Sequence, residues 1–254
     1  MKATEKKALY SFFCNAIDCM EGFASKEVEV DFIDDEESPN VESSSSFLYS
    51  PSYPTSYSFS RKYENMEELR QDVLCCSSCD LCKKRCSVVF GEGPQETMGL
   101  DEVPSVLVVG EAPGYDEDVQ ARPFVGASGK LLDKMLCAID LYRTKNCFIT
   151  NVVKCRPPNN RNPSKNEIAC CLHFLEEQIR LISPKIILLL GNVALKTILH
   201  TEVGISHLHG KLFHYNDSIP TIATYHPSAL LRQESLKRLA WEDLKFFKQK
   251  FNSL

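Results

Sequence analysis

The stretch SVLVVGEAPG, residues 105–114, contains a short apolar run that ends abruptly in glycine, glutamate and proline. Runs of four to eight aliphatic and β-branched residues of this kind predict buried strands. Similar runs follow at residues 148–153, 185–190 and 221–225. Patterns with helical spacing lie around them, at residues 66–75, 128–139, 164–182, 192–199 and from 227 to about 251. Ser164 and Glu167 predict a capping box at the start of the 164–182 helix.

Buried strands that alternate with amphipathic helices indicate a parallel sheet covered on both faces. We therefore predict an α/β fold, a three-layer α/β/α arrangement with a central four-stranded parallel sheet. Residues 63–254 form this domain. Residues 1–62 precede it as a poorly ordered acidic and serine-rich leader with a short amphipathic helix at 4–20, because an acidic run and a Ser/Tyr/Pro tract follow that helix.

Charge is divided unevenly along the chain, whose formal net charge is −5. Residues 1–60 hold four lysines and eleven acidic residues, whereas the rest holds 25 basic and 23 acidic residues. The mildly basic remainder permits nucleic-acid binding without demonstrating it. No run of 18 apolar residues and no signal-peptide pattern is present, so we predict a cytoplasmic protein that does not bind membranes.

Polar residues lie near or after the carboxyl ends of three of the four predicted strands. Ligands bind at this edge in open parallel sheets. Glu111 and the acidic stretch 116–118, interpreted as a loop, follow the first strand; Asn151 lies on the second, and His226 follows the fourth. With Phe124, they would place acids, an amide, an aromatic ring and an imidazole at one rim, as in a hydrolytic or base-recognition site. Taken singly, the acids could be a solvated loop, His226 a helix cap, and Phe124 part of the core.

Five segments occur in a fixed order along the chain: GEAPG (110–114), ED (117–118), RPFVG (122–126), NVVKCRPPNNRNP (151–163) and HPSALLR (226–232). The set resembles the type 4 uracil-DNA glycosylases, the iron–sulfur branch of their superfamily, from about Cys76 to the C-terminal helix. Tyr115 and the extra cysteines depart from that pattern. The resemblance implies a base excision repair enzyme that flips uracil out of DNA and hydrolyses its N-glycosidic bond, giving free uracil and an abasic site. We also predict that the protein is a monomer.

The resemblance also implies the catalytic residues. Glu111 and Glu117 are the two candidates to orient the attacking water, with Glu111 slightly favoured. His226 would donate a hydrogen bond to the departing uracil. Ala112, a small residue where the better-known uracil glycosylase motif has aspartate, would line the substrate site.

Further residues would hold the substrate. By the same resemblance, Phe124 stacks on the flipped base, and Asn151 bonds its Watson–Crick edge, because one amide offers both a donor and an acceptor. Arg161, Ser228 and Arg232 would contact the DNA backbone.

Twelve cysteines in a chain without an export signal indicate a metal or cluster site rather than disulfides. The run CSSCDLCKKRC, residues 76–86, has the four-cysteine spacing of a bacterial ferredoxin cluster, although serine stands where proline is usual. Spacing alone therefore leaves an iron–sulfur electron-transfer protein open. A non-catalytic binder of damaged DNA with the same fold is a second alternative.

The resemblance selects a different set of ligands for a [4Fe–4S] cluster: Cys76, Cys79, Cys155 and Cys171. It leaves Cys82 and Cys86 as extras, and Cys170 is a rival for Cys171. Four of the other cysteines are interpreted as small buried hydrophobic side chains: Cys14, Cys19, Cys137 and Cys147.

Overall fold

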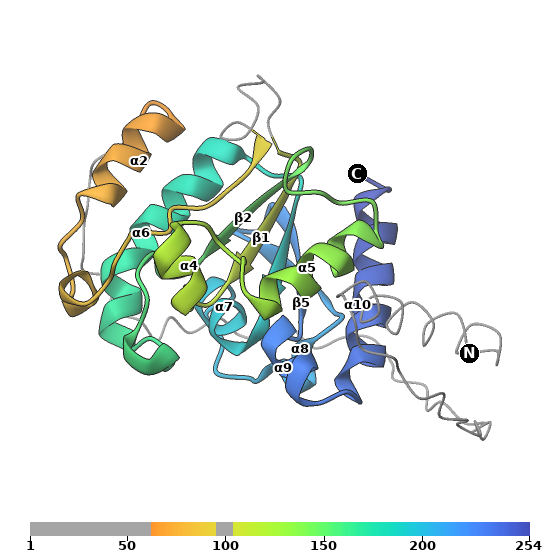
Figure 1. Ribbon diagram of the computed structural model, residues 1–254. Helices are drawn as coiled ribbons and strands as arrows, with labels where there is room; N and C mark the ends of the chain where they lie inside the picture. Colours follow the sequence, from red (N-terminus) through yellow and green to blue (C-terminus); the bar gives the residue numbers. More distant parts are fainter. Residues whose placement is uncertain (1–61, 95–103) are drawn as a thin grey trace, which may run out of the picture. The chain divides into compact units, whose positions relative to one another are not determined.

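The computed structural model describes residues 62–94 and 104–254 (Figure 1). The expected leader and its amphipathic helix lie outside these ranges, apart from residue 62. The described chain forms a five-stranded sheet in the order β2-β1-β3-β5-β4. Four of the strands are parallel: β1 (Val106–Gly110), β2 (Cys147–Asn151), β3 (Ile186–Leu190) and β5 (Ile219–Thr224).

The α/β fold and the four parallel strands are confirmed, but the predicted count of four strands is wrong. Strand β4 (Leu212–Tyr215) adds an antiparallel edge beside β5. Its side chains alternate between exposed and half-buried, so this segment has no continuous apolar run. A short, half-exposed edge strand carries little sequence signal.

The predicted helices are present with small shifts at their ends: α2 (Met66–Leu74), α5 (Ala127–Cys137), α6 (Lys165–Ile182) and α7 (Gly191–Ile198). The capping box of α6 is confirmed, since Ser164 Oγ accepts from the Glu167 amide at 3.3 Å and the Glu167 carboxylate accepts from the Ser164 amide at 2.7 Å. The structure adds α8 (Ile205–Leu208) and two short 3₁₀ turns, η1 (Asp80–Lys83) and η2 (Pro158–Asn160).

Three local predictions are wrong. The helix expected from 227 to about 251 is two helices, α9 (Pro227–Arg232) and α10 (Leu236–Phe251), because the backbone at Gln233 is extended. The acidic stretch 116–118, expected in a loop, lies in α4 (Tyr115–Gln120). Cys147 is buried as expected, whereas Cys137 is exposed; Cys14 and Cys19 lie outside the described ranges.

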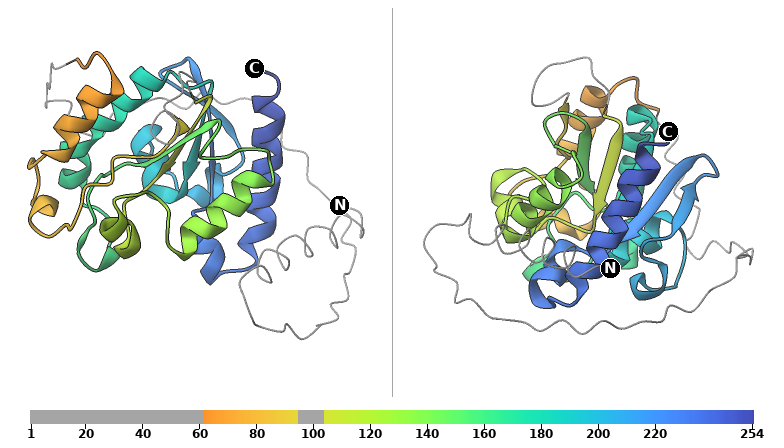
Figure 2. Two further views of the ribbon diagram at one scale, coloured as in Figure 1. Left: turned by 45° about the horizontal axis from the view of Figure 1, so that its top comes forward. Right: turned by 90° about the vertical axis from the view of Figure 1, so that its right-hand side faces the viewer.

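Helices cover both faces of the sheet, with α5 on one side and α7 on the other (Figure 2). The connections from β1 to β2 and from β2 to β3 run in opposite directions across the sheet. Because such crossovers are right-handed, their helices fall on opposite faces. The strands β1 and β3 between these layers are buried at every residue. No helix in the described ranges is both long and apolar enough to cross a bilayer.

The parallel strands bring distant segments to one edge. Gly110 at the end of β1 lies opposite Asn151 at the end of β2, and Leu190 of β3 lies opposite Thr224 of β5. The residues that follow all four strands therefore emerge side by side, as the rule for open parallel sheets requires.

Candidate active site and cysteine pocket

A cleft of about 450 Å³ opens at this edge of the sheet. All nine residues predicted for catalysis, substrate binding or DNA contact line it: Glu111, Ala112, Glu117, Phe124, Asn151, Arg161, Ser228, His226 and Arg232. Asn192 and Tyr225 also line the cleft, and the sequence interpretation missed both. Asn192 is the second residue after β3 and was assigned only to a helix start, although its position after a buried strand was the signal that could have identified it.

Phe124 and Asn151 face each other across the last residue of β1. A Cβ built on Gly110 would lie 2.4 Å from Phe124 Cζ and 2.4 Å from Asn151 Oδ1, so only glycine fits between them. Asn151 is 2% exposed, and its Oδ1 has no hydrogen-bond partner within the described ranges. Since buried polar atoms are nearly always paired, an unpaired oxygen in a cleft points to a ligand that supplies a donor.

His226 lies beside Phe124, with 5.6 Å between the ring centroids. Its Nδ1 accepts from the Ser228 backbone N–H at 3.2 Å and bonds the Ser228 hydroxyl at 2.8 Å. Because a backbone N–H can only donate, Nδ1 is unprotonated, and the proton of the neutral ring is on Nε2. Burial, assisted by the charge of Arg232, lowers the pKa of His226 to about 4. The imidazole is therefore neutral at pH 7 and offers an Nε2–H donor.

The two candidate glutamates differ in their surroundings. The Glu117 carboxylate accepts three backbone N–H groups, from Val125 at 2.8 Å, Gly126 at 3.0 Å and Gly114 at 3.0 Å. Glu111 lines the same cleft, and burial raises the pKa of its carboxyl group above the ordinary value. Glu117 is thus largely occupied in holding loops, whereas Glu111 is in an environment that makes a carboxylate more basic.

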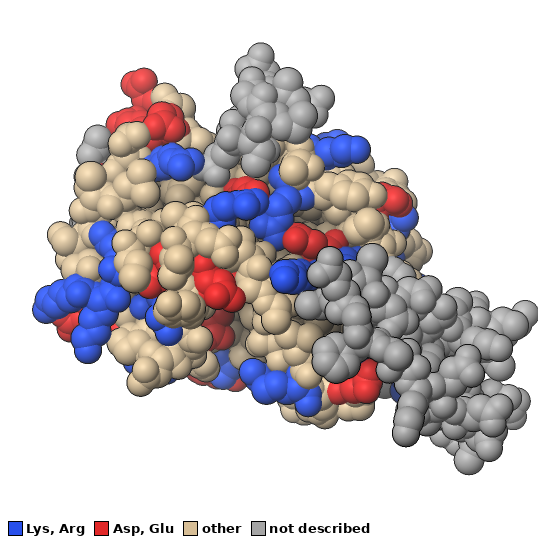
Figure 3. Space-filling model, in the orientation of Figure 1, with Lys and Arg blue, Asp and Glu red and all other residues tan. Residues whose placement is uncertain are grey.

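One of the two arginines that line the cleft, Arg161, is already paired with an acid. Arg161 makes two bonds to Glu167, of 2.8 and 2.7 Å, and this pairing lowers the pKa of Glu167 to about 2. Figure 3 shows Lys and Arg side chains in separate patches interspersed with Asp and Glu on the face drawn there, rather than in one basic surface. Binding of a phosphate backbone would therefore depend on a few local groups at the cleft.

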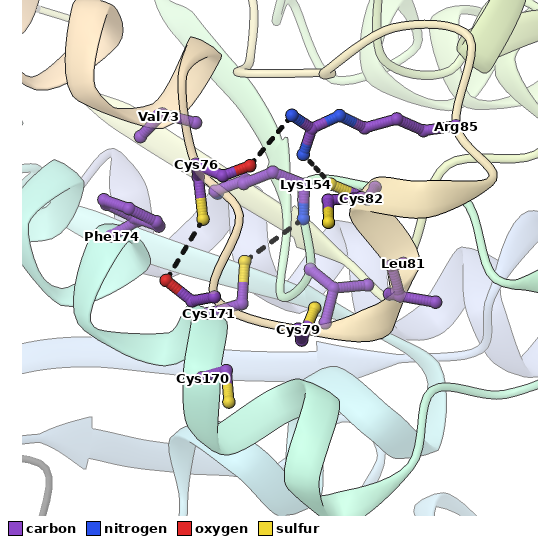
Figure 4. Close-up of a pocket in the computed structure, with 13 residues that line it drawn as sticks. Val73, Cys76, Cys79, Leu81, Cys82, Arg85, Lys154, Cys170, Cys171 and Phe174 are labelled. Atoms are coloured by element: carbon purple, nitrogen blue, oxygen red, sulfur yellow. Dashed lines mark hydrogen bonds between the residues drawn. The ribbon is translucent and has the colours of Figure 1, made fainter.

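A second pocket gathers six cysteines from three distant segments: Cys76, Cys79, Cys82, Cys155, Cys170 and Cys171. Cys86, the last member of the ferredoxin-like run, is exposed and does not line this pocket. The structure therefore brings together the four cysteines that the resemblance selects, which we call the distributed set: Cys76, Cys79, Cys155 and Cys171. It does not bring together all four cysteines of the local run at residues 76–86. In Figure 4 the Cys171 sulfur points toward the Lys154 backbone, whereas the neighbouring Cys170 side chain points the other way.

Hydrogen-bond donors surround the sulfur atoms of this pocket (Figure 4). Arg85 Nη1 donates to Cys155 Sγ at 3.0 Å, and the Lys154 backbone N–H donates to Cys171 Sγ at 3.3 Å. Burial raises the pKa of Cys171 to about 12, so its thiol stays neutral unless a metal displaces the proton. Nearby cations and N–H donors are the surroundings that favour anionic, metal-bound sulfur.

The donor set of the pocket thus fits a thiolate-bound cluster. Within the described ranges, no three His, Cys, Asp or Glu side chains converge as ligands of a single metal ion. In a cluster of four irons each thiolate binds a different iron, so its ligands stand farther apart than those of one ion.

The cysteine pocket and the cleft are tied together by buried polar groups. The Lys154 side chain is 1% exposed, and its Nζ donates to the Asn151 carbonyl at 2.8 Å, to Thr150 Oγ1 at 2.7 Å and to Gln178 Oε1 at 2.7 Å. Asp118 of α4 is also 1% exposed and accepts from the backbone N–H of Cys86 at 3.0 Å. Segments around the cysteines therefore support both the strand that carries Asn151 and the helix that carries Glu117.

Comparison with known proteins agrees with this geometry. The model of the uracil DNA glycosylase superfamily matches residues 99–245. The type-4 uracil-DNA glycosylase of Sulfurisphaera tokodaii is 40% identical over 190 residues, which cover 72% of this chain and 83% of that protein. Its counterpart in Archaeoglobus fulgidus is 38% identical over 189 residues, covering 72% and 91%. The enzyme of the same name in Thermotoga maritima is 41% identical over 184 residues, covering 71% and 92%. The resemblance inferred from the sequence is confirmed, and the chain belongs to the uracil-DNA glycosylase superfamily, in which these type-4 enzymes are its relatives.

Proposed function

We propose that this protein is a uracil-DNA glycosylase, which flips uracil out of DNA, hydrolyses its N-glycosidic bond and leaves an abasic site. The observation that carries the proposal is the unpaired, buried oxygen of Asn151 facing Phe124 in a cleft of this family. A glycosylase must read an extruded base in a closed pocket, and an amide beside an aromatic ring is suited to that task. The relatives named as type-4 uracil-DNA glycosylases support the same activity.

Base recognition rests on Phe124, Asn151 and Ala112. The Phe124 ring stacks on the flipped uracil, and the Asn151 amide pairs with its N3–H and O4. Cytosine places an acceptor and a donor at the corresponding positions, so a buried amide oriented for uracil would leave its own groups unpaired with cytosine. A binding site discriminates strongly against a ligand that leaves its buried polar groups unpaired. Ala112 leaves room beside the base.

His226 acts when the bond breaks. Uracil leaves as an anion, and a preorganised donor that meets this charge lowers the barrier by roughly 3–4 kcal/mol. The neutral ring with its proton on Nε2 is suited to this role, because Ser228 holds the other nitrogen as an acceptor. A neutral donor stabilises the anion without giving up a proton.

Glu111 orients the attacking water and offsets positive charge on the sugar. Its raised pKa makes the carboxylate a better base, and the three N–H bonds of Glu117 leave that residue to shape the loops around the cleft. Ser228, Arg161 and Arg232 line the cleft and would contact the DNA backbone there. Arg161 would share its guanidinium between Glu167 and phosphate.

Cys76, Cys79, Cys155 and Cys171 would hold a [4Fe–4S] cluster in the cysteine pocket. When bound, the cluster would crosslink the segment before β1, the loop after β2 and helix α6. The hydrolysis transfers no electrons, so the cluster would stabilise the loops beside the cleft. The electron-transfer alternative is less well supported, because Cys86 lies outside the pocket. Location in the cytoplasm and a monomeric state stay predictions from the sequence.

The proposed activity is tested with holo-protein purified without oxygen. The protein is incubated with oligonucleotides containing uracil or thymine at one position, single-stranded or paired with guanine, and abasic sites are then cleaved with alkali. Alkali-labile sites should form only in the uracil oligonucleotides, and Asn151→Ala, prepared in parallel, should form almost none. If the holo-protein binds these oligonucleotides but forms no alkali-labile sites, the non-catalytic binder is the correct function.

A further inference from the structure

Phe124 has a backbone conformation that side chains rarely adopt. Its φ is +53°, in the left-handed region, where a bulky residue persists only if its surroundings hold it. The loop also lies very close to α5, since a Cβ on Gly129 would be 1.9 Å from the Phe124 carbonyl oxygen. The orientation of the ring thus depends on how the peptide groups of this loop are fixed.

Arg143 fixes the carbonyl side of the loop. Its Nη1 donates to the Pro123 carbonyl at 3.0 Å, and its Nη2 donates to the Phe124 carbonyl at 3.0 Å. The other donors go to Glu92, at 3.1 Å, and to Asp133, at 2.9 and 2.7 Å. All five N–H groups of the guanidinium are therefore used. The Arg143 side chain is only 11% exposed, so most of it lies against the loop rather than in solvent.

The N–H side of the same loop is held by Glu117, which accepts from Val125 and Gly126. The positively charged Arg143 thus fixes the carbonyl groups of this loop, and the negatively charged Glu117 fixes its N–H groups. Arg122 provides a useful contrast. It pairs with the same Glu92 carboxylate, at 2.7 Å, but its side chain is 55% exposed and no hydrogen bond joins it to the Pro123 or Phe124 carbonyl.

We propose that Arg143 is a positioning residue that sets the Phe124 ring against the flipped base and so contributes to affinity for uracil in DNA. The proposal rests on the proposed function, because it acts through the stacking of Phe124 on the base. Lysine can replace this arginine only in part, since one ammonium cannot reach two carbonyls and two carboxylates with the planar geometry of a guanidinium.

The test compares two DNA ligands with the holo-protein at fixed salt. One carries a non-hydrolysable 2′-fluorinated deoxyuridine, and the other carries an abasic-site analogue, which lacks the base that Phe124 would stack on. Arg143→Met should weaken binding of the uracil analogue by about 5- to 100-fold, the range for losing one base–aromatic stack. Its affinity for the abasic analogue should stay within about twofold of wild type. Arg143→Lys should show a smaller loss with the same selectivity, and Arg122→Gln should change neither affinity.

A thermal melt measures the stability of each variant. If Arg143→Met does not fold, the comparison is made with Arg143→Lys. Equal loss of affinity for both ligands, or an equal effect from Arg122→Gln, would overturn the proposal, because either result indicates a general loss of structure. The Phe124→Leu variant distinguishes a failure of the positioning role of Arg143 from a failure of the proposed function. If Phe124→Leu weakens uracil binding and the Arg143 variants do not, only the role of Arg143 is wrong. If Phe124→Leu has no effect, stacking itself is wrong and the positioning role fails with it.

Discussion

Replacing Gly110 by alanine tests the base pocket with a single methyl group. Gly110 ends β1 and lies opposite Asn151 in the sheet. The added Cβ would be 2.4 Å from Asn151 Oδ1 and 2.4 Å from Phe124 Cζ. Non-bonded atoms normally stay about 3.5–4.0 Å apart, so the ring, the amide or the strand has to retreat by about 1 Å.

The expected cost follows from that displacement. A misplacement of about 1 Å in a substrate-positioning group lowers the rate by about 10²-fold. The added methyl group also overpacks the core, which costs about 1–3 kcal/mol of folding free energy. For a domain of this size each kcal/mol lowers the Tm by roughly 2–4 °C. Because the Phe124 ring borders an open cleft and can swing into it, we expect a stability loss near the lower end, with the larger effect on uracil removal.

Single-turnover cleavage of a uracil oligonucleotide by excess holo-protein measures the chemical rate, and a thermal melt measures stability. The matched control is Gly204→Ala. A Cβ there would meet Asn192 Oδ1 at 3.5 Å and Ser206 Oγ at 3.9 Å, which are ordinary contacts, and its φ is −80°. The control should stay within about twofold of the wild-type rate, in line with the small effect of substitutions that create no clash. If Gly110→Ala also cleaves within a few-fold of wild type, Phe124 and Asn151 do not hold the base as described.

Further predictions concern the catalytic groups and the cluster. His226→Ala should slow single-turnover cleavage by about 10²–10³-fold at fixed salt, with little change in DNA affinity; a matching loss of affinity would make His226 a positioning residue. Because the pKa of His226 is about 4, its ring is already neutral at pH 6.5, so the wild-type rate should show no inflection there. The rate should fall as the pH drops through the raised pKa of Glu111, since only the carboxylate can orient water, and Glu111→Gln should be slow at every pH. If Glu111→Gln retains the wild-type rate and acid limb, another group orients the water. Cys155→Ala should lose the brown colour of anaerobically purified protein, whereas Cys86→Ala should keep it; the reverse pattern would favour the local cysteine run.

Much of the architecture could be predicted because burial leaves a local pattern. The strands β1 and β3 are buried on both faces, so every residue in them is apolar or glycine and each strand appears as an uninterrupted run. The motifs that follow the strands could be assigned to one edge, since parallel strands end together. The edge strand β4 and the break at Gln233 could not be predicted, because a half-exposed strand and a single extended residue leave no such run.

The partners of individual side chains required the tertiary structure. Sequence alone assigned Glu111 and Glu117 to one role, and the three N–H groups that occupy Glu117 come from loops on both sides of α4. Lys154 and Arg143 were not singled out, because charged side chains usually face solvent. Lys154 is buried and Arg143 is largely so, since the fold supplies three acceptors for Lys154 and two carbonyls with two carboxylates for Arg143.

The sequence by itself therefore determined the family, the parallel sheet and the edge at which the motifs meet, because these depend on residue types and on periodicity within each element. Only the tertiary structure decided the tautomer of His226, the different surroundings of the two glutamates and the pocket that Cys76 and Cys79 share with Cys155 and Cys171 but not with Cys86. Those properties depend on distances between groups that lie far apart in the chain or belong to different loops, and packing sets such distances without leaving a local pattern.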